Sequence, residues 1–554
     1  MRLVIVGGVA GGASAAARAR RLSEDAEIVL VERGPDISYA TCGIPYFVGG
    51  EVTSSSELLV QTPQAMRRRF AIDVRVRTEA LRVDRETREI ALRDLERGTL
   101  ERTSYDALIL ATGALPLRPR LPGIERPGHF TLRTVADGRA VSAWIAERSA
   151  RTAVIVGGGF IGLEMAEQLR VRGLEVTLVE ALPQVMSTLD PEMASLLHAE
   201  LRANGVDLRL GDAVDRFDAP ERGARASTVA LRGGARLPAD IVVLALGVRP
   251  DVRLAREAGL EIGALGGIRV DERMRTSDPR IRAVGDAVEV RHTVTGAWSL
   301  ISLAGPASRQ GRIAADGVFG RDSRYPGTLG TGILRLFGLT AACTGATETM
   351  LVSSATPHHA VHLHPASHVG FYPGAAPMAL KVLFSPDDGR LLGAQAVGRV
   401  AVDKRIDVLA TALRGGMTVD DLAELELAYA PPFGSARDPI NLAGMAAQSV
   451  TAGDVAQAHW REVASLDRAS IFLLDVRDPA EWAEGQIAGA AHIPLGELRE
   501  RLDEIPRERE VVVFCRSGQR SYYACRILSQ RGIRCRNLSG AYLTWRAGMG
   551  DPEH

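Results

Sequence analysis

The fold of this chain is decided by RLVIVGGVAGGASAAARARRL at residues 2–22, together with EIVLVE at residues 27–32. The first stretch predicts a buried strand, a glycine turn and a helix, and the second predicts another buried strand. Gly7 would form the tight turn and Gly12 would let the helix approach the strand, while Glu32 can accept hydrogen bonds from a ribose. A glycine turn alone is a weak signal, but strand, turn, helix and acid together predict a dinucleotide-binding unit.

A second unit of the same kind begins at Ala153 with AVIVGGGFIGLEMAEQL and continues into EVTLVE, which ends at Glu180. Its motif glycines are Gly157, Gly159 and Gly162, whereas the first unit has Val9 at the middle position. A carboxylate at Glu180 accepts from a free 2'-hydroxyl and repels a 2'-phosphate, so we predict NADH rather than NADPH. The alternative is a solvated glutamate at a strand end.

The composition is that of a large folded protein. The chain has 554 residues, of which 46% are hydrophobic and 24% charged, and its net charge is zero. We find no apolar run near the roughly 18 residues that span a bilayer, and the strand after Met1 reaches Gly7 too soon for a signal peptide. We therefore expect a cytoplasmic protein that binds neither membranes nor nucleic acid. Five scattered cysteines without a CxxC pair predict free thiols and no metal site.

Further strand and glycine patterns occur in LILATGA at 108–114, VVLALGVRPD at 242–251 and AVGDA at 283–287. With the two units above, they resemble flavoprotein reductases in which an NAD domain is inserted into an FAD domain. The resemblance implies an α/β fold with two Rossmann-like domains, FAD and NADH as cofactors, and Asp286 on the flavin ribitol. The FAD-side residues it implies are Gly7, Gly12, Glu32, Arg33, Ala111, Thr112, Gly113 and Asp286.

One candidate redox cysteine, Cys42, lies in SYATCGIPYFVGG at residues 38–50. Dithiol reductases of this superfamily carry a second cysteine five residues later, where this chain has Phe47. A lone thiolate beside a flavin can attack a disulfide or a persulfide, or peroxide can oxidise it to a sulfenic acid. The residues alone leave these reactions open.

The segment at 38–50 and YAPPFGSARDPIN at 429–441 resemble the coenzyme A disulfide reductase group, and the match extends over the first 447 residues. The resemblance implies Cys42 as nucleophile and, from a partner subunit, Tyr429 as a hydroxyl near the sulfur. The substrate contacts it implies are Arg21, Ser38, Thr41 and Arg437. The cluster Arg67, Arg68 and Arg69 either adds to this site or is a solvated helix surface. Relatives often have a tyrosine where this chain has Phe371, before Tyr372, which disfavours bulky coenzyme A disulfide and leaves smaller persulfides open.

From about residue 462 the pattern becomes a short α/β unit, in which the strand VVVF leads into the loop CRSGQRS at 515–521. We expect backbone N–H groups, the following helix, Arg516 and Arg520 to lower the pKa of the Cys515 thiol. The segment resembles a single-domain rhodanese, which implies Cys515 as a sulfur-carrying nucleophile. We expect Asp475 to brace the fold, and Cys343, Cys525 and Cys535 to be packing residues.

The expected domains are FAD-binding (1–118 and 247–322), NADH-binding (119–246), dimerisation with an α+β fold (323–447), a linker (448–461) and rhodanese (462–554). The predicted function is NADH-driven, FAD-dependent reduction of persulfide, polysulfide or coenzyme A persulfide by a homodimer, coupled to sulfur transfer at Cys515. One alternative is coenzyme A disulfide reduction. An NADH oxidase or peroxidase would leave the rhodanese unit unexplained, and a redox-regulatory binding protein is the alternative from another class.

Overall fold

The computed structural model describes residues 1–220, 226–467 and 470–550. The chain divides into two compact units. The first unit comprises Met1–Pro183 and Asn204–Gly330, and the second comprises Gln184–Ala203 and Thr331–His554. Within the described residues, none of the helices has the length and apolar character needed to cross a membrane.

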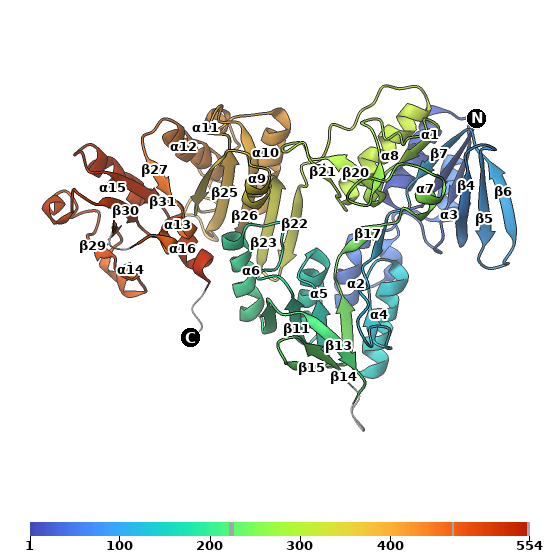
Figure 1. Ribbon diagram of the computed structural model, residues 1–554, viewed down its shortest axis with the longest axis horizontal. Helices are drawn as coiled ribbons and strands as arrows, with labels where there is room; N and C mark the ends of the chain where they lie inside the picture. The colour runs from blue at the N-terminus through green and yellow to red at the C-terminus, as the bar shows by residue number, and fades with distance from the viewer. Residues whose placement is uncertain (221–225, 468–469, 551–554) are drawn as a thin grey trace. The chain divides into compact units, whose positions relative to one another are not determined.

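The first unit is built on a parallel five-stranded sheet that carries the first glycine loop (Figure 1). In spatial order its strands are β19 (Ile281–Ala283), β7 (Ala107–Leu110), β1 (Arg2–Val6), β2 (Glu27–Val31) and β3 (Asp73–Arg75). Helices α1 (Ala10–Leu22) and α8 (Ala304–Val318) approach closely, since a Cβ at Gly311 would lie 2.1 Å from the carbonyl oxygen of Gly11. A meander of β4 (Thr78–Asp84), β5 (Glu89–Asp94) and β6 (Leu100–Ser104) follows β3.

A second parallel sheet is inserted into the first domain, as the sequence predicted. Its strands in spatial order are β12 (Val206–Leu210), β11 (Glu175–Glu180), β10 (Thr152–Val156), β16 (Ile241–Leu244) and β9 (His129–Phe130). The chain leaves the first sheet through β8 (Ala114–Pro116) and returns through β17 (Val248–Pro250), and these two strands pair with each other. Helices α4 (Val135–Arg148) and α5 (Phe160–Val171) and a meander of β13 (Val214–Asp218), β14 (Ser227–Leu231) and β15 (Arg236–Ala239) complete this insertion.

The second unit contains an antiparallel sheet of β22 (Gly332–Leu336), β23 (Leu339–Gly345), β26 (Leu391–Gly398), β25 (Met378–Phe384) and β24 (His359–Leu363), in that spatial order. Strand β24 is therefore an edge strand. The helices of this part are α6 (Pro191–Ala203), α9 (Glu348–Ser353), α10 (Val402–Gly415), α11 (Val419–Glu424) and α12 (Pro439–Thr451). Strands β25 and β26 are buried along their whole length, because both of their faces are covered.

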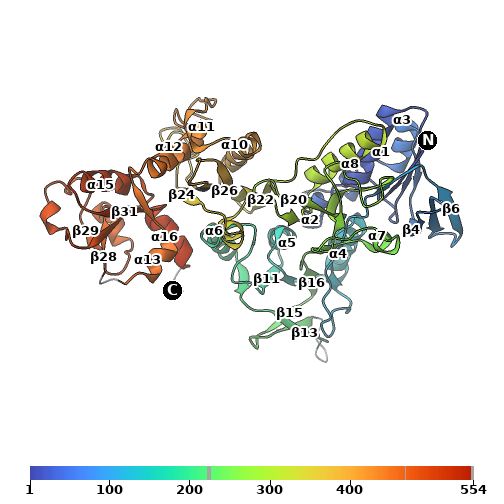
Figure 2. The same cartoon turned by 45° about the horizontal axis from the view of Figure 1, so that its top comes forward.

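The C-terminal part of the second unit is a parallel sheet flanked by helices, which Figure 2 shows from a second direction. Its strands in spatial order are β27 (Ala456–Ala458), β31 (Cys535–Leu538), β30 (Glu510–Phe514), β28 (Ile471–Asp475) and β29 (Ala491–His492). Its helices are α13 (Trp460–Ser465), α14 (Pro479–Ala483), α15 (Gln519–Ser529) and α16 (Ala541–Met549). The segment that we expected as a linker, 448–461, holds the end of α12, strand β27 and the start of α13, so the C-terminal sheet already begins at β27.

Candidate functional site

The first glycine loop has the shape that a dinucleotide phosphate requires. Gly7 has a φ of 101°, and a Cβ there would lie 2.1 Å from the carbonyl oxygen of Ala111. A Cβ at Gly12 would lie 1.8 Å from the carbonyl oxygen of Gly7, so neither position can carry a side chain. The Glu32 carboxylate accepts the N–H of Gly8 at 2.8 Å and therefore lies beside the loop.

The second glycine loop has the same kinds of close contact as the first. Gly157 has a φ of 108°, and its Cβ would lie 2.3 Å from the carbonyl oxygen of Ala245. A Cβ at Gly162 would lie 1.9 Å from the carbonyl oxygen of Gly157. The Glu180 carboxylate accepts the N–H of Gly158 at 2.7 Å, as Glu32 does in the first loop.

The middle position of the motif differs from the other two, because the protein itself does not demand glycine there. A Cβ at Gly159 would meet no atom of the protein within 4 Å. Val9 precedes α1 in the first loop and forms its N-cap. A glycine at this position serves the approach of a ligand, so Val9 is compatible with the fold of the first unit.

Asp286 has a partner that the sequence did not reveal. The carboxylate lies in the short 3-10 helix η3 (Gly285–Ala287) and accepts a hydrogen bond from Arg133 Nη2 at 2.8 Å. The Thr112 hydroxyl donates to the carbonyl oxygen of Asp251 at 2.6 Å, which ties together the two segments that cross between the sheets. Arg133 and Asp286 are 153 residues apart in sequence, so a local pattern could not have paired them.

Arg33 lies on the surface beside a cavity of about 440 Å³. The arginines that line this cavity are Arg33, Arg249, Arg253 and Arg256, and the carboxylates are Asp251 and Glu257. Positive charge therefore exceeds negative charge around it, which suits a polyphosphate. The contact of Arg33 with a cofactor stays a prediction.

Cys42 lies in a short 3-10 helix, η1 (Thr41–Gly43), directly before α2 (Ile44–Gly49). The cysteine is exposed. A Cβ at Gly43 would lie 2.5 Å from Leu58 Cδ2, so the turn packs tightly against the residues beneath it. This fixed turn presents Cys42 at the surface of the first unit, as an accessible nucleophile requires.

The residues before Cys42 connect its turn to the first glycine loop. Ser38 has a φ of 47° and donates its N–H to the carbonyl oxygen of Gly8 at 2.7 Å. Burial, with the nearby Glu32 carboxylate, raises the pKa of Tyr39 to about 12, so its hydroxyl stays protonated at neutral pH. The structure therefore brings Ser38, Glu32 and the glycine loop together in one region of the first unit.

The other predicted substrate residues are divided between the two units. Arg21 lies exposed in the last turn of α1, and Arg68 and Arg69 are exposed on α3 (Pro63–Phe70). Arg67 on the same helix donates to the carbonyl oxygen of Val74. Tyr429 and Arg437 are exposed in the second unit. Their predicted roles at Cys42 therefore stay predictions.

The loops of the antiparallel sheet domain expose several aromatic rings. Their exposed fractions are 79% for Phe371, 69% for Phe433, 49% for Tyr429 and 39% for Tyr372. The two loops that carry them are joined, since the N–H of Val369 donates to the carbonyl oxygen of Gly434 at 3.1 Å. Large exposed aromatic side chains gathered on two neighbouring loops are typical of a surface that binds another protein.

Cys515 directly follows β30 and is buried at the start of the loop that leads to α15. Its Sγ accepts the N–H of Gly518 at 3.1 Å and the hydroxyl of Ser521 at 3.5 Å. Gly518 has a φ of 107°, a conformation that turns the loop back toward the sulfur. The loop therefore places one N–H donor and one O–H donor on the Cys515 sulfur, and the sulfur-carrying role of Cys515 stays a prediction.

The two arginines of this loop differ in their surroundings. Arg520 donates to Asp478 and Glu481, with distances of 2.7 Å to both carboxylates, whereas Arg516 is exposed. The buried Asp475 pairs with Arg477 at 2.7 Å, and this pair braces the loop after β28 as expected. Arg516 is therefore the more available of the two for an anionic sulfur donor.

The remaining cysteines lie in packed surroundings. Cys343 is buried, and burial raises the pKa of its thiol. Cys535 donates its S–H to the carbonyl oxygen of Cys525 at 3.4 Å. A hydrogen bond between the two side chains, together with burial, raises the pKa of the Cys525 thiol well above its ordinary value. The raised pKa values make Cys343 and Cys525 poor nucleophiles compared with an exposed or N–H-stabilised sulfur. The same hydrogen bond with Cys525 lowers the pKa of the partly buried Cys535 thiol.

Known protein families match almost the whole chain. The family model described as pyridine nucleotide-disulphide oxidoreductase matches residues 1–311. The model of the dimerisation domain of that family matches residues 335–439, and the model of the rhodanese-like domain matches residues 460–548.

Proteins similar to this chain include an NADH oxidase, a CoADR-RHD and a persulfide reductase. The NADH oxidase of Methanocaldococcus jannaschii is 34% identical over 80% of this chain and 98% of its own length. The crystal structure of reduced CoADR-RHD from Bacillus anthracis has 45% identity and a TM-score of 0.96, and covers 99% of this chain and 98% of that one. The structure of the NAD-dependent persulfide reductase from A. fulgidus has 37% identity and a TM-score of 0.91, and covers 98% of this chain and 100% of that one.

Proposed function

We propose that this chain, which belongs to the pyridine nucleotide-disulphide oxidoreductase family, uses NADH and FAD to reduce persulfide sulfur at Cys42 and transfers sulfane sulfur at Cys515. The observation that carries the proposal is the pair of cysteine sites on separate folds, one exposed and one held among N–H and O–H donors. A likeness to a persulfide reductase that extends over both folds supports it.

The residues of both glycine loops fit the two cofactors. FAD would lie along Gly7, Gly12 and Glu32, with Asp286 toward its ribitol, and NADH would lie along the loop that ends beside Glu180. The space above Gly159, where a Cβ would meet nothing, fits a close-lying pyrophosphate. Bound FAD would carry two electrons from NADH to the sulfur at Cys42.

Cys42 would act as the nucleophile of the reduction. Its thiolate attacks the inner sulfur of a persulfide RSSH, so that a bond forms between Cys42 Sγ and the sulfur attached to R. The S–S bond of the persulfide breaks, and hydrosulfide leaves with the electron pair. Two electrons from NADH and a proton then cleave the mixed disulfide, which releases RSH and restores the Cys42 thiolate.

Cys515 would carry sulfane sulfur. Its thiolate attacks the outer sulfur of a donor such as thiosulfate, and the donor's S–S bond breaks to release sulfite. The product is a Cys515 persulfide, whose negative charge the N–H of Gly518 and the hydroxyl of Ser521 would stabilise. A thiol acceptor takes the outer sulfur and returns Cys515 to the thiolate.

The working form would be a homodimer. The exposed rings of Phe371, Phe433, Tyr429 and Tyr372 lie on the domain that matches the dimerisation model, and burial of these rings would favour association. Tyr429 would then reach the sulfur site of the partner subunit, as the resemblance to coenzyme A disulfide reductases implies.

Steady-state consumption of NADH with each candidate acceptor tests the proposal. We expect fast turnover with a small persulfide, slower turnover with coenzyme A disulfide, and little with oxygen or peroxide. Cys42→Ser should abolish persulfide turnover and leave thiosulfate sulfurtransfer at Cys515 measurable. Cys515→Ser should abolish thiosulfate sulfurtransfer and leave the reduction of a small persulfide at Cys42 measurable. Oxygen as the best acceptor would favour an oxidase, and a single stoichiometric reduction of the flavin without turnover would favour a binding protein.

A further inference from the structure

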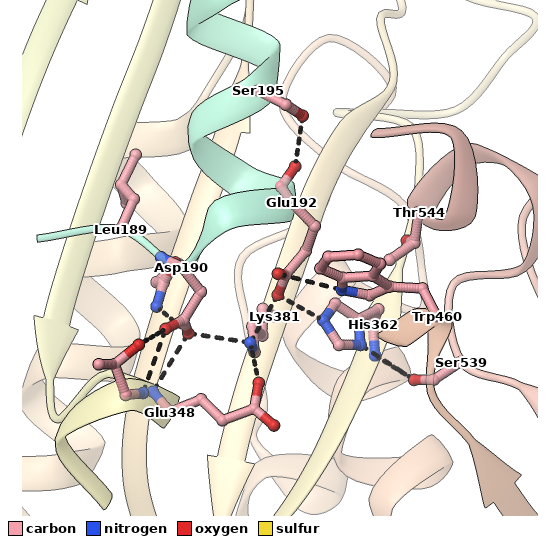
Figure 3. Close-up of polar contacts among 12 residues, drawn as sticks. Leu189, Asp190, Glu192, Ser195, Glu348, His362, Lys381, Trp460, Ser539 and Thr544 are labelled. Atoms are coloured by element: carbon pink, nitrogen blue, oxygen red, sulfur yellow. Dashed lines mark hydrogen bonds and ion pairs between the residues drawn. The ribbon is translucent and has the colours of Figure 1, made fainter. Parts of the chain in front are cut away.

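The rhodanese-like domain is fastened to the edge of the antiparallel sheet by a serine and a histidine (Figure 3). His362 lies on edge strand β24, and its backbone N–H donates to Ser539 Oγ at 3.0 Å. The same hydroxyl lies 3.0 Å from His362 Nδ1. Ser539 and His362 are 3% and 8% exposed, so water does not compete effectively for these bonds.

The contacts of His362 assign a role to each of its polar atoms. Nε2 lies 3.1 Å from Glu192 Oε1 and therefore carries the proton that it donates to the carboxylate. Nδ1 lies 3.0 Å from the Ser539 hydroxyl, which also accepts the backbone N–H of His362. The pair is thus joined by two hydrogen bonds.

Glu192 connects this pair to the rest of the second unit. Its Oε2 accepts the indole N–H of Trp460 at 3.2 Å, and its Oε1 lies 2.6 Å from Lys381 Nζ. Burial alone would disfavour the ionised carboxylate, but Lys381 and His362 hold the pKa of Glu192 well below its ordinary value. Glu192 therefore binds the sheet and the rhodanese-like domain through one buried charge (Figure 3).

Lys381 is one of only two lysines in the chain, and it lies at the centre of this cluster. Of the 67 Lys and Arg residues in the chain, only Lys381 and Lys404 are lysines. The Nζ atom of the fully buried Lys381 meets Asp190 at 2.9 Å, Glu192 at 2.6 Å and Glu348 at 2.6 Å. A compact ammonium with three N–H donors matches three carboxylates that converge on one point.

From Ser539 the connection continues directly to the loop of Cys515. A Cβ at Gly540 would lie 2.7 Å from His362 Cβ, so the start of α16 packs against strand β24. The first turn of α16 then holds the loop, because the N–H of Tyr542 donates to the carbonyl oxygen of Cys515 at 3.0 Å. The N–H of Leu543 likewise donates to the carbonyl oxygen of Arg516 at 3.1 Å.

We propose that Ser539 is a positioning residue for sulfur transfer, and that His362, from outside the rhodanese-like domain, sets the orientation of the Cys515 loop through Ser539 and α16. This inference rests on the sulfurtransferase part of the proposed function. The N–H of Gly518 and the hydroxyl of Ser521 can stabilise the Cys515 sulfur only while the loop keeps its orientation. A contact that holds the loop in place therefore also maintains the stabilisation of this sulfur.

The test compares full-length variants in the thiosulfate sulfurtransferase assay and in the pH profile of Cys515 alkylation, followed by mass spectrometry. In Ser539→Ala we expect kcat to fall on the order of tenfold with little change in KM, because the nucleophile is misplaced rather than removed. The alkylation profile should shift to higher pH, because the loosened loop stabilises the thiolate less. Ser539→Thr keeps the hydroxyl and should restore kcat and the pH profile of alkylation toward those of the parent.

The matched control is Ser367→Ala. Ser367 is 1% exposed, and its Oγ lies 3.1 Å from Nδ1 of His368, so this variant loses a similar buried bond that does not involve the rhodanese-like domain. Ser367→Ala should leave the sulfurtransferase kcat and the pH profile of Cys515 alkylation unchanged. His362→Ala removes the same junction from outside the rhodanese-like fold and serves if Ser539→Ala does not fold.

The proposal would be overturned if Ser539→Ala, His362→Ala and the parent had the same sulfurtransferase kcat and the same pH profile of Cys515 alkylation. An equal shift in Ser367→Ala would overturn it as well, because general loosening of the unit would then explain the effect. A parent enzyme without sulfurtransferase activity would refute that part of the proposed function, while the alkylation profiles would still decide whether Ser539 positions Cys515.

Discussion

Glu180 is the residue on which we expect coenzyme choice to depend. Its carboxylate accepts the backbone N–H groups of Gly158 at 2.7 Å and of Leu182 at 2.9 Å, and is thereby fixed at the edge of the second glycine loop. A fixed negative charge repels a 2'-phosphate, at a cost on the order of a few kcal/mol when water is excluded. We expect kcat/KM for flavin reduction to be much higher with NADH than with NADPH. Glu180→Arg should lower the ratio of these two kcat/KM values by at least about tenfold.

Glu175→Arg is the matched control for this prediction. Glu175 begins the same strand, β11, and is exposed at the end away from the loop. The variant makes the same change of charge on the same element, so it should leave the ratio of the two kcat/KM values unchanged. Comparable kcat/KM values for NADH and NADPH in the parent would refute the assignment of Glu180.

Sequence reasoning at the residue scale succeeded where a residue acts within its own segment. The steric demand for glycine at Gly7 and Gly12 arises within one βαβ unit, so a short motif predicts it. The pairing of Arg133 with Asp286 depends on the folded chain, and the motif contains no trace of it. Lys381 did offer a signal, since a charged residue inside the apolar stretch MALKVLF must find buried partners, although the sequence does not name them.

At the scale of elements, helix α6 contains a buried histidine from which we expect a loss of stability in acid. His198 is 9% exposed, and its Nε2 accepts the N–H of Val185 at 3.2 Å, so the imidazole must be neutral in the folded state. Burial, with the nearby Arg202, lowers its pKa to about 4 from an ordinary value of 6.5. Between these two values the unfolded chain binds a proton that the folded chain does not, so stability falls as the pH falls.

We therefore expect the midpoint of thermal unfolding to decrease from pH 7 to pH 5, with a contribution from His198 on the order of 2 kcal/mol at pH 5. Burial also lowers the pKa of His364 and of His459 to about 4, so these two residues contribute in the same direction. His198→Gln removes one of the three titrations and should reduce the slope by its share. His359→Gln, at an exposed position on β24, is the control and should retain the slope of the parent. An unchanged slope in His198→Gln would show that another group governs the acid response.

Element boundaries were least predictable where a strand is short. Strand β27 has three residues, too few to show the alternation that marks a strand in sequence, and its pairing with β31 fixes it. The expected linker at 448–461 therefore contains regular structure. The helix that follows β30, by contrast, was predictable from the loop CRSGQRS and the strand VVVF, because both signals are local.

At the scale of the whole molecule, one chain joins a rhodanese-like domain to a domain of the pyridine nucleotide-disulphide oxidoreductase family. A persulfide is reactive and easily lost to solvent, so attachment of the carrier raises its effective concentration at the reductase, to roughly the millimolar range for a short connection. The contacts of Ser539 and Glu192 hold the rhodanese-like domain against the dimerisation sheet within the second unit. A free tether is therefore replaced by a fixed junction within the second unit.

The relay hypothesis predicts that Cys515 loads sulfur and Cys42 reduces it for some donors only. Cys515→Ser should slow NADH consumption several-fold with bulky or polymeric sulfur donors, which need a carrier, and should spare small persulfides that diffuse directly to the exposed Cys42. Cys535→Ser, which changes a partly buried thiol of the same domain, is the matched control and should behave as the parent with every donor. Equal rates for Cys515→Ser and the parent across all donors would leave the rhodanese-like domain as an independent sulfurtransferase, whose product leaves the enzyme before Cys42 acts on it.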